Sequence, residues 1–210
     1  GSDDARLAEA RAVVEDVARS VERVISGKPE AVRLSLVALL ALVPASMAPS
    51  AQAQAARFRV LISVDMEGVA GTVTGDQLGP TGFEYGRFRE FMTREALAAV
   101  NLARAGGATD IIVADAHGNG ENLVIELFPP DVRIIRSWPR PLGMVAGVDQ
   151  ADAVIFIGYH ASTNNVQGVR AHTFSSGTLT RVALNGVNVS EGSWAAAIAG
   201  AGAAASADTC

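Results

Sequence analysis

The stretch Val60-Leu61-Ile62-Ser63-Val64-Asp65-Met66-Glu67-Gly68 places two carboxylates and a glycine directly after a short apolar run. A continuous apolar run of this length predicts a β-strand at Val60–Val64 that is covered on both faces. Side chains alternate along extended backbone, so Asp65 and Glu67 are expected to project from one face. Two neighbouring carboxylates repel each other unless a cation or a proton lies between them. An ordinary solvated pair at a strand end is the alternative interpretation.

The fold predicted around this strand is of the α/β class. A segment with helical periodicity, Phe83–Arg104, follows the first strand and ends at Gly106-Gly107. Three more short apolar runs predict strands at Ile111–Ala114, Val132–Ile135 and Val154–Ile157. Strands that alternate with helices indicate a largely parallel sheet with flanking helices, over about residues 57–200.

The remainder of this region predicts shorter elements. Further strands are expected at Val169–Phe174, Leu179–Leu184 and Val187–Val189, with Asn185-Gly186 as a hairpin turn. Ser190 is expected to cap a closing helix that begins at Glu191. Residues 201–210 are almost all Ala, Gly and Ser, which predicts a disordered tail or a lost reading frame.

Residues 1–32 predict an amphipathic helical extension that is separate from this domain. Apolar residues recur at helical spacing over residues 2–26, and Gly27 follows. The sequence of residues 27–32, running into Leu36-Val37-Ala38-Leu39-Leu40, resembles the N-terminal helices of MoxR-like AAA+ ATPases over about residues 5–40. The chain has no G-x-x-x-x-G-K-[ST] motif, so an ATPase function is excluded.

Residues 33–56 have the features of a secretory signal. Arg33 precedes the apolar run Leu34–Val43, and Ala51-Gln52-Ala53-Gln54-Ala55 supplies an A-x-A cleavage pattern. About ten apolar residues are too few to span a bilayer, which needs roughly 20. A functional signal predicts export to the periplasm, whereas a buried helix followed by a linker would leave the protein in the cytoplasm.

The composition narrows the possible partners and metal ligands. With 22 acidic and 17 basic residues, the net charge of −5 argues against nucleic acid as the main partner. The single cysteine, Cys210, excludes an intrachain disulfide framework and a thiolate metal site. A zinc ion would therefore need histidine and carboxylate ligands.

The chain has only three histidines, and two of them follow predicted strands. His117 comes after Ile111–Ala114, and His160 comes after Val154–Ile157. The carboxyl ends of parallel strands form the usual ligand site of open α/β sheets. Imidazole and carboxylate without sulfur suit zinc, with manganese or iron possible, so a metal site is predicted at this edge.

Two further polar residues have more than one interpretation. His172 lies twelve residues beyond His160 and could be another ligand, a proton-transfer group or a buried structural histidine. Glu191 begins the last predicted helix, where the helix dipole alone favours a carboxylate.

Taken together, Ser63–Gly68, Asp115-Ala116-His117, Gly158–Ala161, His172 and Glu191-Gly192 resemble the zinc-dependent D-aminopeptidase family of the dipeptide-transport type. Tyr85-Gly86-Arg87 and Met92–Glu95 also fit that family, and the resemblance covers about residues 58–200. It implies two zinc ions per subunit, with Asp65 bridging them, Glu67 and His160 completing one site, and His117 and Glu191 completing the other. It assigns the catalytic role to His172.

The reaction implied by the resemblance is hydrolysis of N-terminal D-amino acids, of the D-Ala type, from short peptides. The resemblance also implies a ring-shaped homo-oligomer and a second half of the fold that this chain lacks. The alternative is a truncated, inactive remnant that binds metal, or a fragment that folds poorly. A phosphohydrolase with Asp65 as nucleophile is a lesser alternative, because it leaves the histidines unexplained.

Overall fold

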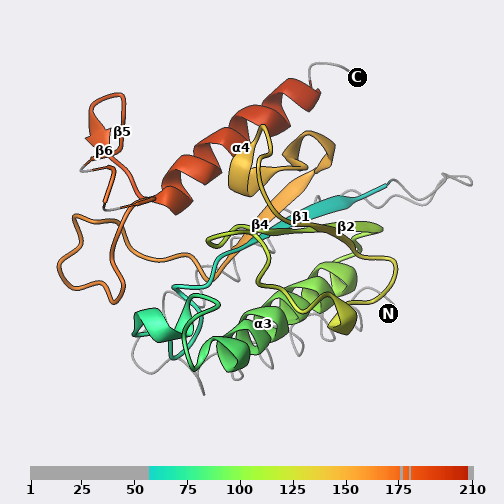
Figure 1. Ribbon diagram of the computed structural model, residues 1–210. Coiled ribbons are helices and arrows are strands. Elements are labelled where there is room, and N and C mark those ends of the chain that lie inside the picture. Colours follow the sequence, from blue (N-terminus) through green and yellow to red (C-terminus); the bar gives the residue numbers. More distant parts are fainter. Residues whose placement is uncertain (1–56, 176, 180, 208–210) are drawn as a thin grey trace, which may run out of the picture. The chain divides into compact units, whose positions relative to one another are not determined.

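The computed structural model describes residues 57–175, 177–179 and 181–207. The predicted helix at 2–26 and the signal-like segment 33–56 lie outside the described residues, as do the last three residues of the predicted tail. The described part has the predicted α/β architecture, built on a parallel sheet (Figure 1).

Four parallel strands form the main sheet in the order β3-β2-β1-β4. Their bounds are β1 Arg59–Val64, β2 Asp110–Asp115, β3 Arg133–Ile135 and β4 Ala153–Ile157. Each coincides with a predicted strand to within one residue. The first strand in the chain is therefore central, with β2 on one side and β4 on the other.

The register of β1 brings three strand ends together. Val64 pairs with Asp115 of β2 on one side and with Ile157 of β4 on the other. All three strands run in the same direction, so the residues that follow them emerge at one edge of the sheet. This edge carries the polar residues singled out from the sequence.

Helices cover the two faces of the sheet (Figure 1). Helix α3, Tyr85–Ala105, packs Phe88, Met92 and Val100 against the face that carries Ile62 and Val64. Helix α4, Glu191–Ala207, packs Ala195 and other residues on the opposite face, which carries Leu61. The alternation of β1 side chains between two apolar layers explains why the strand reads as a continuous apolar run.

Short 3-10 helices occupy the connections, at Gly75–Gln77, Ile125–Leu127, Gly143–Val145 and Val148–Gln150. The last two lie on the α4 side of the sheet, where Val145 and Val148 are fully buried. They complete the second apolar layer, to which α4 contributes buried Ala195 and Ala199, with Trp194 and Ile198 packed against the same cluster.

In the segment after β4 the structure differs from two predictions. The strand predicted at Val169–Phe174 is wrong, because Arg170 and Phe174 adopt positive φ angles of 55°, which interrupt extended backbone. The strand predicted at Leu179–Leu184 is reduced to β5, Ala183–Leu184. Leu179, the first residue of the predicted strand, instead closes a turn, in which its backbone N–H donates to the Ser175 carbonyl (2.8 Å).

The hairpin predicted after β5 is confirmed. Strand β6, Val187–Asn188, pairs antiparallel with β5. Asn185 and Gly186 form the turn with φ angles of 50° and 83°, values that Asn and Gly tolerate best.

Helix α4 begins at Glu191, as predicted, and extends past the predicted domain end at residue 200. It continues to Ala207, so most of the predicted tail is helical. Alanine is the strongest helix former, which accounts for this continuation. The Ser190 hydroxyl accepts a hydrogen bond from the Ser193 N–H (3.0 Å), the expected cap.

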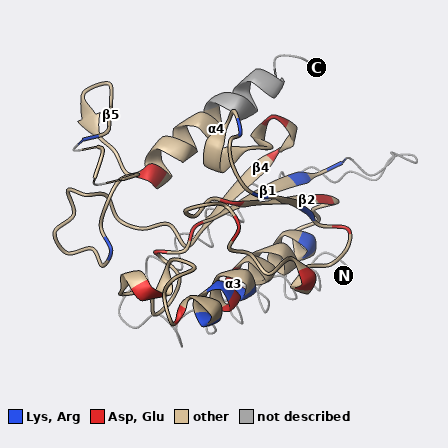
Figure 2. Ribbon diagram, in the orientation of Figure 1, with Lys and Arg blue, Asp and Glu red and all other residues tan. Residues whose placement is uncertain are grey.

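Figure 2 marks the charged residues on the ribbon, and α3 carries both basic and acidic positions. Arg87, Glu90 and Arg94 of α3 are exposed. No acidic residue occurs between Asp152 and Glu191 in the sequence. Within the described ranges, neither helix has the length and apolar character needed to cross a membrane.

Candidate metal centre

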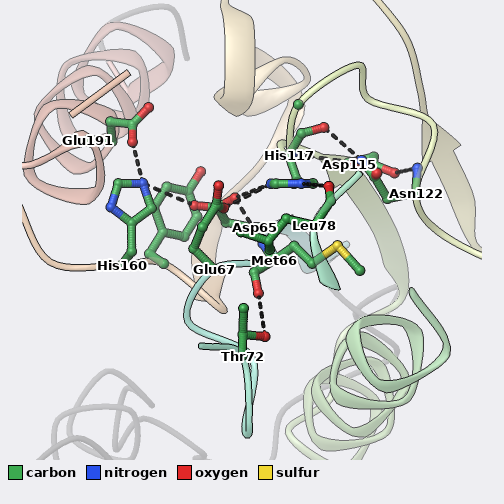
Figure 3. A network of polar contacts seen from close by, with 12 residues as sticks. Asp65, Met66, Glu67, Thr72, Leu78, Asp115, His117, Asn122, His160 and Glu191 are labelled. Carbon is green, nitrogen blue, oxygen red and sulfur yellow. Dashed lines mark hydrogen bonds and ion pairs between the residues drawn. The ribbon is translucent and has the colours of Figure 1, made fainter. Parts of the chain in front are cut away.

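The polar residues predicted at the strand ends meet in one pocket (Figure 3). Asp65 and Glu67 follow β1, His117 follows β2, His160 follows β4, and Glu191 is the first residue of α4. His172 reaches the same pocket from the irregular segment after β4. The structure therefore brings together all six residues that the sequence analysis selected.

Two of the histidines make close contacts with the carboxylates. The Nδ1 atom of His117 lies 2.8 Å from Glu67 Oε2 and 3.3 Å from Asp65 Oδ1. The Nε2 atom of His160 contacts Glu191 Oε2 and lies 3.7 Å from Asp65 Oδ2. The two carboxylate oxygens of Asp65 therefore face different histidines, which is the arrangement expected of a carboxylate between two cation sites.

Each histidine has its other ring nitrogen against a backbone carbonyl. His117 Nε2 lies 2.7 Å from the Leu78 oxygen, His160 Nδ1 lies 2.9 Å from the Ala161 oxygen, and His172 Nδ1 lies 2.6 Å from the Arg170 oxygen. A carbonyl only accepts, so these nitrogens carry the hydrogen. In the neutral ring, the nitrogen that faces the pocket is then the one with the lone pair, as is usual for metal-ligating histidine.

His172 lies directly on His160, with ring centroids 3.6 Å apart and planes 10° from parallel. The backbone N–H of His172 donates to the Ala161 carbonyl (3.1 Å), which fixes the backbone at this point. Its Nε2 atom lies 3.5 Å from Glu67 Oε1. His172 therefore has a free ring nitrogen beside the carboxylates, although its side chain is more exposed than those of His117 and His160.

The two carboxylates that follow β1 have opposite pKa shifts. Burial raises the pKa of Asp65 to about 7, although the hydrogen bond with His117 acts in the opposite direction. Burial would also raise the pKa of Glu67, but the hydrogen bond and charge of His117 outweigh it and lower the pKa to about 2. Glu67 is therefore the stronger partner of the His117 imidazolium.

The pKa values of the histidines are raised by these carboxylates. Burial would lower the pKa of His117, yet its contacts with Asp65 and Glu67 raise it to about 10. Burial would also lower the pKa of His160, but Glu191 and the Ala161 carbonyl raise it to about 9. In the metal-free protein a proton therefore lies between each of these histidines and its carboxylate.

The donor set fits a zinc site on an observation independent of these pKa values. Oε2 of Glu191 is buried, and among the described residues its close contact is the ion pair with His160 Nε2 rather than a hydrogen bond of ordinary geometry. A buried carboxylate oxygen against a histidine nitrogen needs a proton or a metal cation between them, and a zinc ion can replace the proton. Nitrogen and oxygen ligands without sulfur suit zinc.

The ligand atoms fall into two overlapping groups. Asp65, Glu67 and His117 form one, and Glu67, His160 and His172 form the other, with the ligand atoms of each group within 4.8 Å of one another. The resemblance paired His117 with Glu191, whereas the direct contact of Glu191 is with His160. The pairing of ligands to individual ions therefore stays a prediction.

Several residues of the site were not selected from the sequence. Tyr159 lines the pocket, and its hydroxyl lies 2.8 Å from Ser63 Oγ, which itself donates to the Met144 carbonyl (2.5 Å). The tyrosine hydroxyl therefore donates to Ser63. Only its position immediately before His160 could have indicated it. The Leu78 carbonyl has no sequence signal, because every residue carries a carbonyl.

Comparison with known proteins places this site in a family. The family model described as D-aminopeptidase, peptidase family M55, matches residues 58–204. The chain belongs to this D-aminopeptidase family. The matched residues contain all six pocket residues selected from the sequence, together with the whole of α3 and most of α4.

Two relatives show how far the similarity to other D-aminopeptidases extends. A D-aminopeptidase of Bacillus subtilis (strain 168) is 32% identical over 120 residues, which are 57% of this chain and 43% of that protein. A solved structure of a Zn-dependent D-aminopeptidase, DppA from Bacillus subtilis, described as a self-compartmentalizing protease, has a TM-score of 0.63 at 30% identity. That match covers 69% of this chain and 52% of the other. The chain thus spans about half the length of these relatives.

Proposed function

We propose that this chain is a zinc-dependent aminopeptidase that hydrolyses N-terminal D-amino acids, of the D-Ala type, from short peptides. The observation that carries the proposal is the orientation of the three histidines. Each donates one ring N–H to a backbone carbonyl and directs the other nitrogen toward the carboxylates of one pocket. Membership of the D-aminopeptidase family supports the D-configuration of the substrate.

The pocket would hold two zinc ions in this proposal, with Asp65 between them. Its two oxygens already face His117 and His160, at 3.3 and 3.7 Å. Glu67 and His160 would complete one site, and His117 and Glu191 the other. Zinc bound there would polarise the scissile carbonyl and lower the pKa of the attacking water. The pocket has a cavity volume of about 120 Å³.

His172 is the residue proposed to transfer protons. Its Nδ1–H is held by the Arg170 carbonyl, so Nε2 is available to accept a proton from water and return it to the leaving amine. Stacking on His160 restricts rotation of the ring. The more exposed position of His172 leaves it accessible to a substrate, whereas His117 and His160 are nine-tenths or more buried.

Metal analysis of the purified chain, combined with an assay on short D-Ala and L-Ala peptides, tests this proposal. We expect about two zinc ions per chain and hydrolysis of the D-Ala peptides. His172→Ala is expected to abolish hydrolysis with zinc retained, and Thr163→Ala, a residue of the same segment outside the pocket, is the control. A purified chain without bound metal would overturn the proposal.

Zinc at stoichiometric amounts without hydrolysis would instead select a metal-binding remnant. This outcome is meaningful because the chain spans only about half the length of its relatives. Supplying the metal-loaded chain with the full range of D-Ala and L-Ala peptides separates a missing activity from a wrong substrate.

A homo-oligomer is proposed as the assembly of the chain. Support comes from the similar DppA structure, since that protein is described as self-compartmentalizing. Several large apolar side chains of the segment after β4 are exposed, among them Val166 (98% exposed), Val169 and Val187. Light scattering coupled to size-exclusion chromatography tests this, and a monomer at micromolar concentration would contradict it.

Export to the periplasm is proposed on the sequence of residues 33–56. Arg33, the apolar run and the A-x-A pattern support it. Fractionation of expressing bacteria tests it, together with the mass of the mature chain. Cleavage near Ala55 is expected, and an uncleaved cytoplasmic protein would contradict export.

A further inference from the structure

Beside the metal pocket, a second group of buried polar side chains contacts no proposed ligand atom. Its centre is Asp115, the last residue of β2, which has no solvent exposure. Its carboxylate accepts hydrogen bonds from the backbone N–H groups of Asn122 (2.6 Å) and Leu123 (2.8 Å). The loop that contains His117 begins after Asp115 and ends at Asn122, so these hydrogen bonds hold its two ends together.

Asn122, 1% exposed, connects Asp115 to His117. Its side-chain amide donates to Asp115 Oδ1 (2.9 Å) and to the backbone carbonyl of His117 (2.7 Å). Both hydrogens of the amide are thus used, and one of them holds the ligand's own backbone (Figure 3). The His117 N–H also approaches Asp115 Oδ1, at 3.4 Å.

The amide oxygen of Asn122 has its own donor on α3. The hydroxyl of Tyr85, in the first turn of that helix, donates to Asn122 Oδ1 (2.8 Å). The amide oxygen and both amide hydrogens of Asn122 are therefore satisfied, and the orientation of the side chain is fixed. A rotated amide would place NH2 against the tyrosine donor.

We propose that Asp115, Asn122 and Tyr85 are positioning residues that set the geometry of His117 at the zinc site. The inference rests on the zinc site of the proposed function. His117 is constrained at both ends: the ring by the Leu78 carbonyl and the backbone by Asn122. Metal affinity depends on such outer contacts because they hold the ligand in its bound orientation before metal arrives.

A purely structural role would affect stability without affecting the metal. The distinguishing measurement is the zinc dissociation constant, determined by chelator competition at a temperature well below the unfolding midpoint. The absorption spectrum of the cobalt-substituted protein is the second readout, because it reports ligand geometry directly. Neither readout depends on peptidase activity.

Two variants test the group, one at its central carboxylate and one at the hydroxyl farthest from His117. Asp115→Asn keeps the size of the side chain but directs an NH2 group at N–H donors, whichever way the amide turns. It is expected to weaken zinc binding by about 10–100-fold. Tyr85→Phe removes only the remote hydroxyl, so it should fold normally, and it is expected to weaken zinc binding by a smaller factor and to alter the cobalt spectrum.

Each variant has a matched control. Asp110→Asn changes a carboxylate at the opposite end of the same strand, where it pairs with Arg57 and Arg133. Thr93→Val removes a buried hydroxyl of α3 that accepts from the Val124 N–H (3.0 Å), without contact to His117. Both controls are expected to retain the zinc affinity and the cobalt spectrum of the parent chain.

The outcomes separate this inference from the function it rests on. A parent chain that binds no zinc overturns the proposed function and this inference with it. A parent that binds zinc, with Asp115→Asn and Tyr85→Phe folded and equal to it in affinity and spectrum, overturns the positioning role alone. Loss of affinity in both variants but in neither control supports it.

Discussion

Gly68 and Gly158 lie in direct backbone contact, and this contact holds two of the ligand-bearing strand ends together. The Gly68 N–H donates to the Gly158 carbonyl (2.7 Å), just beyond the hydrogen bond from Asp65 N–H to Ile157 (2.8 Å). A Cβ atom on Gly68 would lie 2.4 Å from the Tyr159 carbonyl oxygen. Only glycine permits this approach, since the neighbouring atoms are backbone and cannot rotate away.

Replacement of Gly68 by alanine is therefore expected to destabilise the protein by about 1–3 kcal/mol and to weaken zinc binding. The added Cβ must separate the segment with Asp65 and Glu67 from the segment with His160. Gly86→Ala is the control, because a Cβ there meets nothing within 4 Å and lies on the first turn of α3. Urea denaturation and zinc titration of both variants would check this, and equal behaviour would contradict it.

Glu191→Gln is expected to reduce zinc affinity by more than the ~10–100-fold that loss of an outer contact produces. The substitution removes the charge of a buried carboxylate whose oxygen faces His160. Glu126→Gln, on an exposed 3-10 helix, is the control. Chelator competition measures both variants. An unchanged affinity in Glu191→Gln would show that this carboxylate does not bind the metal.

Zinc affinity is expected to increase with pH up to about pH 9–10, because zinc must displace protons from His117 and His160. Their pKa values in the folded metal-free protein are raised to about 10 and about 9, above the ordinary 6.5. Displacement of two protons would change the affinity by up to ~100-fold per pH unit. Titration calorimetry in buffers of different ionisation enthalpy counts the protons released. Release of none at pH 7 would contradict the prediction.

The same shifts predict how the zinc-free protein responds to pH. A histidine with a raised pKa adds stability that is complete below its unfolded value of 6.5 and is lost as pH rises through its folded value. The metal-free chain should therefore lose stability between about pH 6.5 and 10, whereas zinc should reverse this loss. Thermal unfolding with a chelator and with zinc, across that range, measures the difference.

The burial of Glu95, away from the metal pocket, predicts a second effect of pH on protein stability. Burial raises the pKa of this carboxyl of α3, although the hydrogen bond from the Ala70 N–H (3.1 Å) acts against the shift. The folded state then holds its proton more tightly than the unfolded state, so stability falls as pH rises above the unfolded value of 4.5. Glu95→Gln keeps an oxygen for Ala70 and should be more stable than the parent at pH 7.

The exposed Glu90 of the same helix provides the comparison for Glu95. Among the described residues it forms a long i,i+4 ion pair with Arg94, at 3.8 Å. Glu90→Gln is expected to change stability by less than about 0.5 kcal/mol at either pH. Urea denaturation at pH 4 and pH 7 in chelator measures both variants, and a Glu95→Gln protein less stable than the parent at pH 7 would contradict the argument.

The sequence was sufficient to predict the strands and the residues that follow them, because each strand is a local run of apolar residues. The apolar run Val60–Val64 predicted β1, and the positions of His117 and His160 after two other apolar runs predicted one shared edge. That inference succeeds because parallel strands must present the same end on the same side. It needed no knowledge of the strand order, which placed β1 between β2 and β4.

Local patterns failed in the segment after β4. Alternating apolar residues indicated a strand at Val169–Phe174, yet positive φ angles at Arg170 and Phe174 turn the chain there. Contacts made at a distance override the local preference, such as the bond from the His172 N–H to Ala161 and the stacking of His172 on His160. The position of the proposed catalytic histidine depends on these contacts.

The sequence by itself determined the chemistry of the site, because the scarcity of histidine and the absence of usable cysteine left few possible ligands. Only the tertiary structure decided which nitrogen of each histidine faces the carboxylates, through the carbonyls of Leu78, Ala161 and Arg170. It also decided that Asn122 holds the backbone of His117. A backbone carbonyl or a buried amide acquires such a role only when folding removes water and brings distant segments to hydrogen-bonding distance.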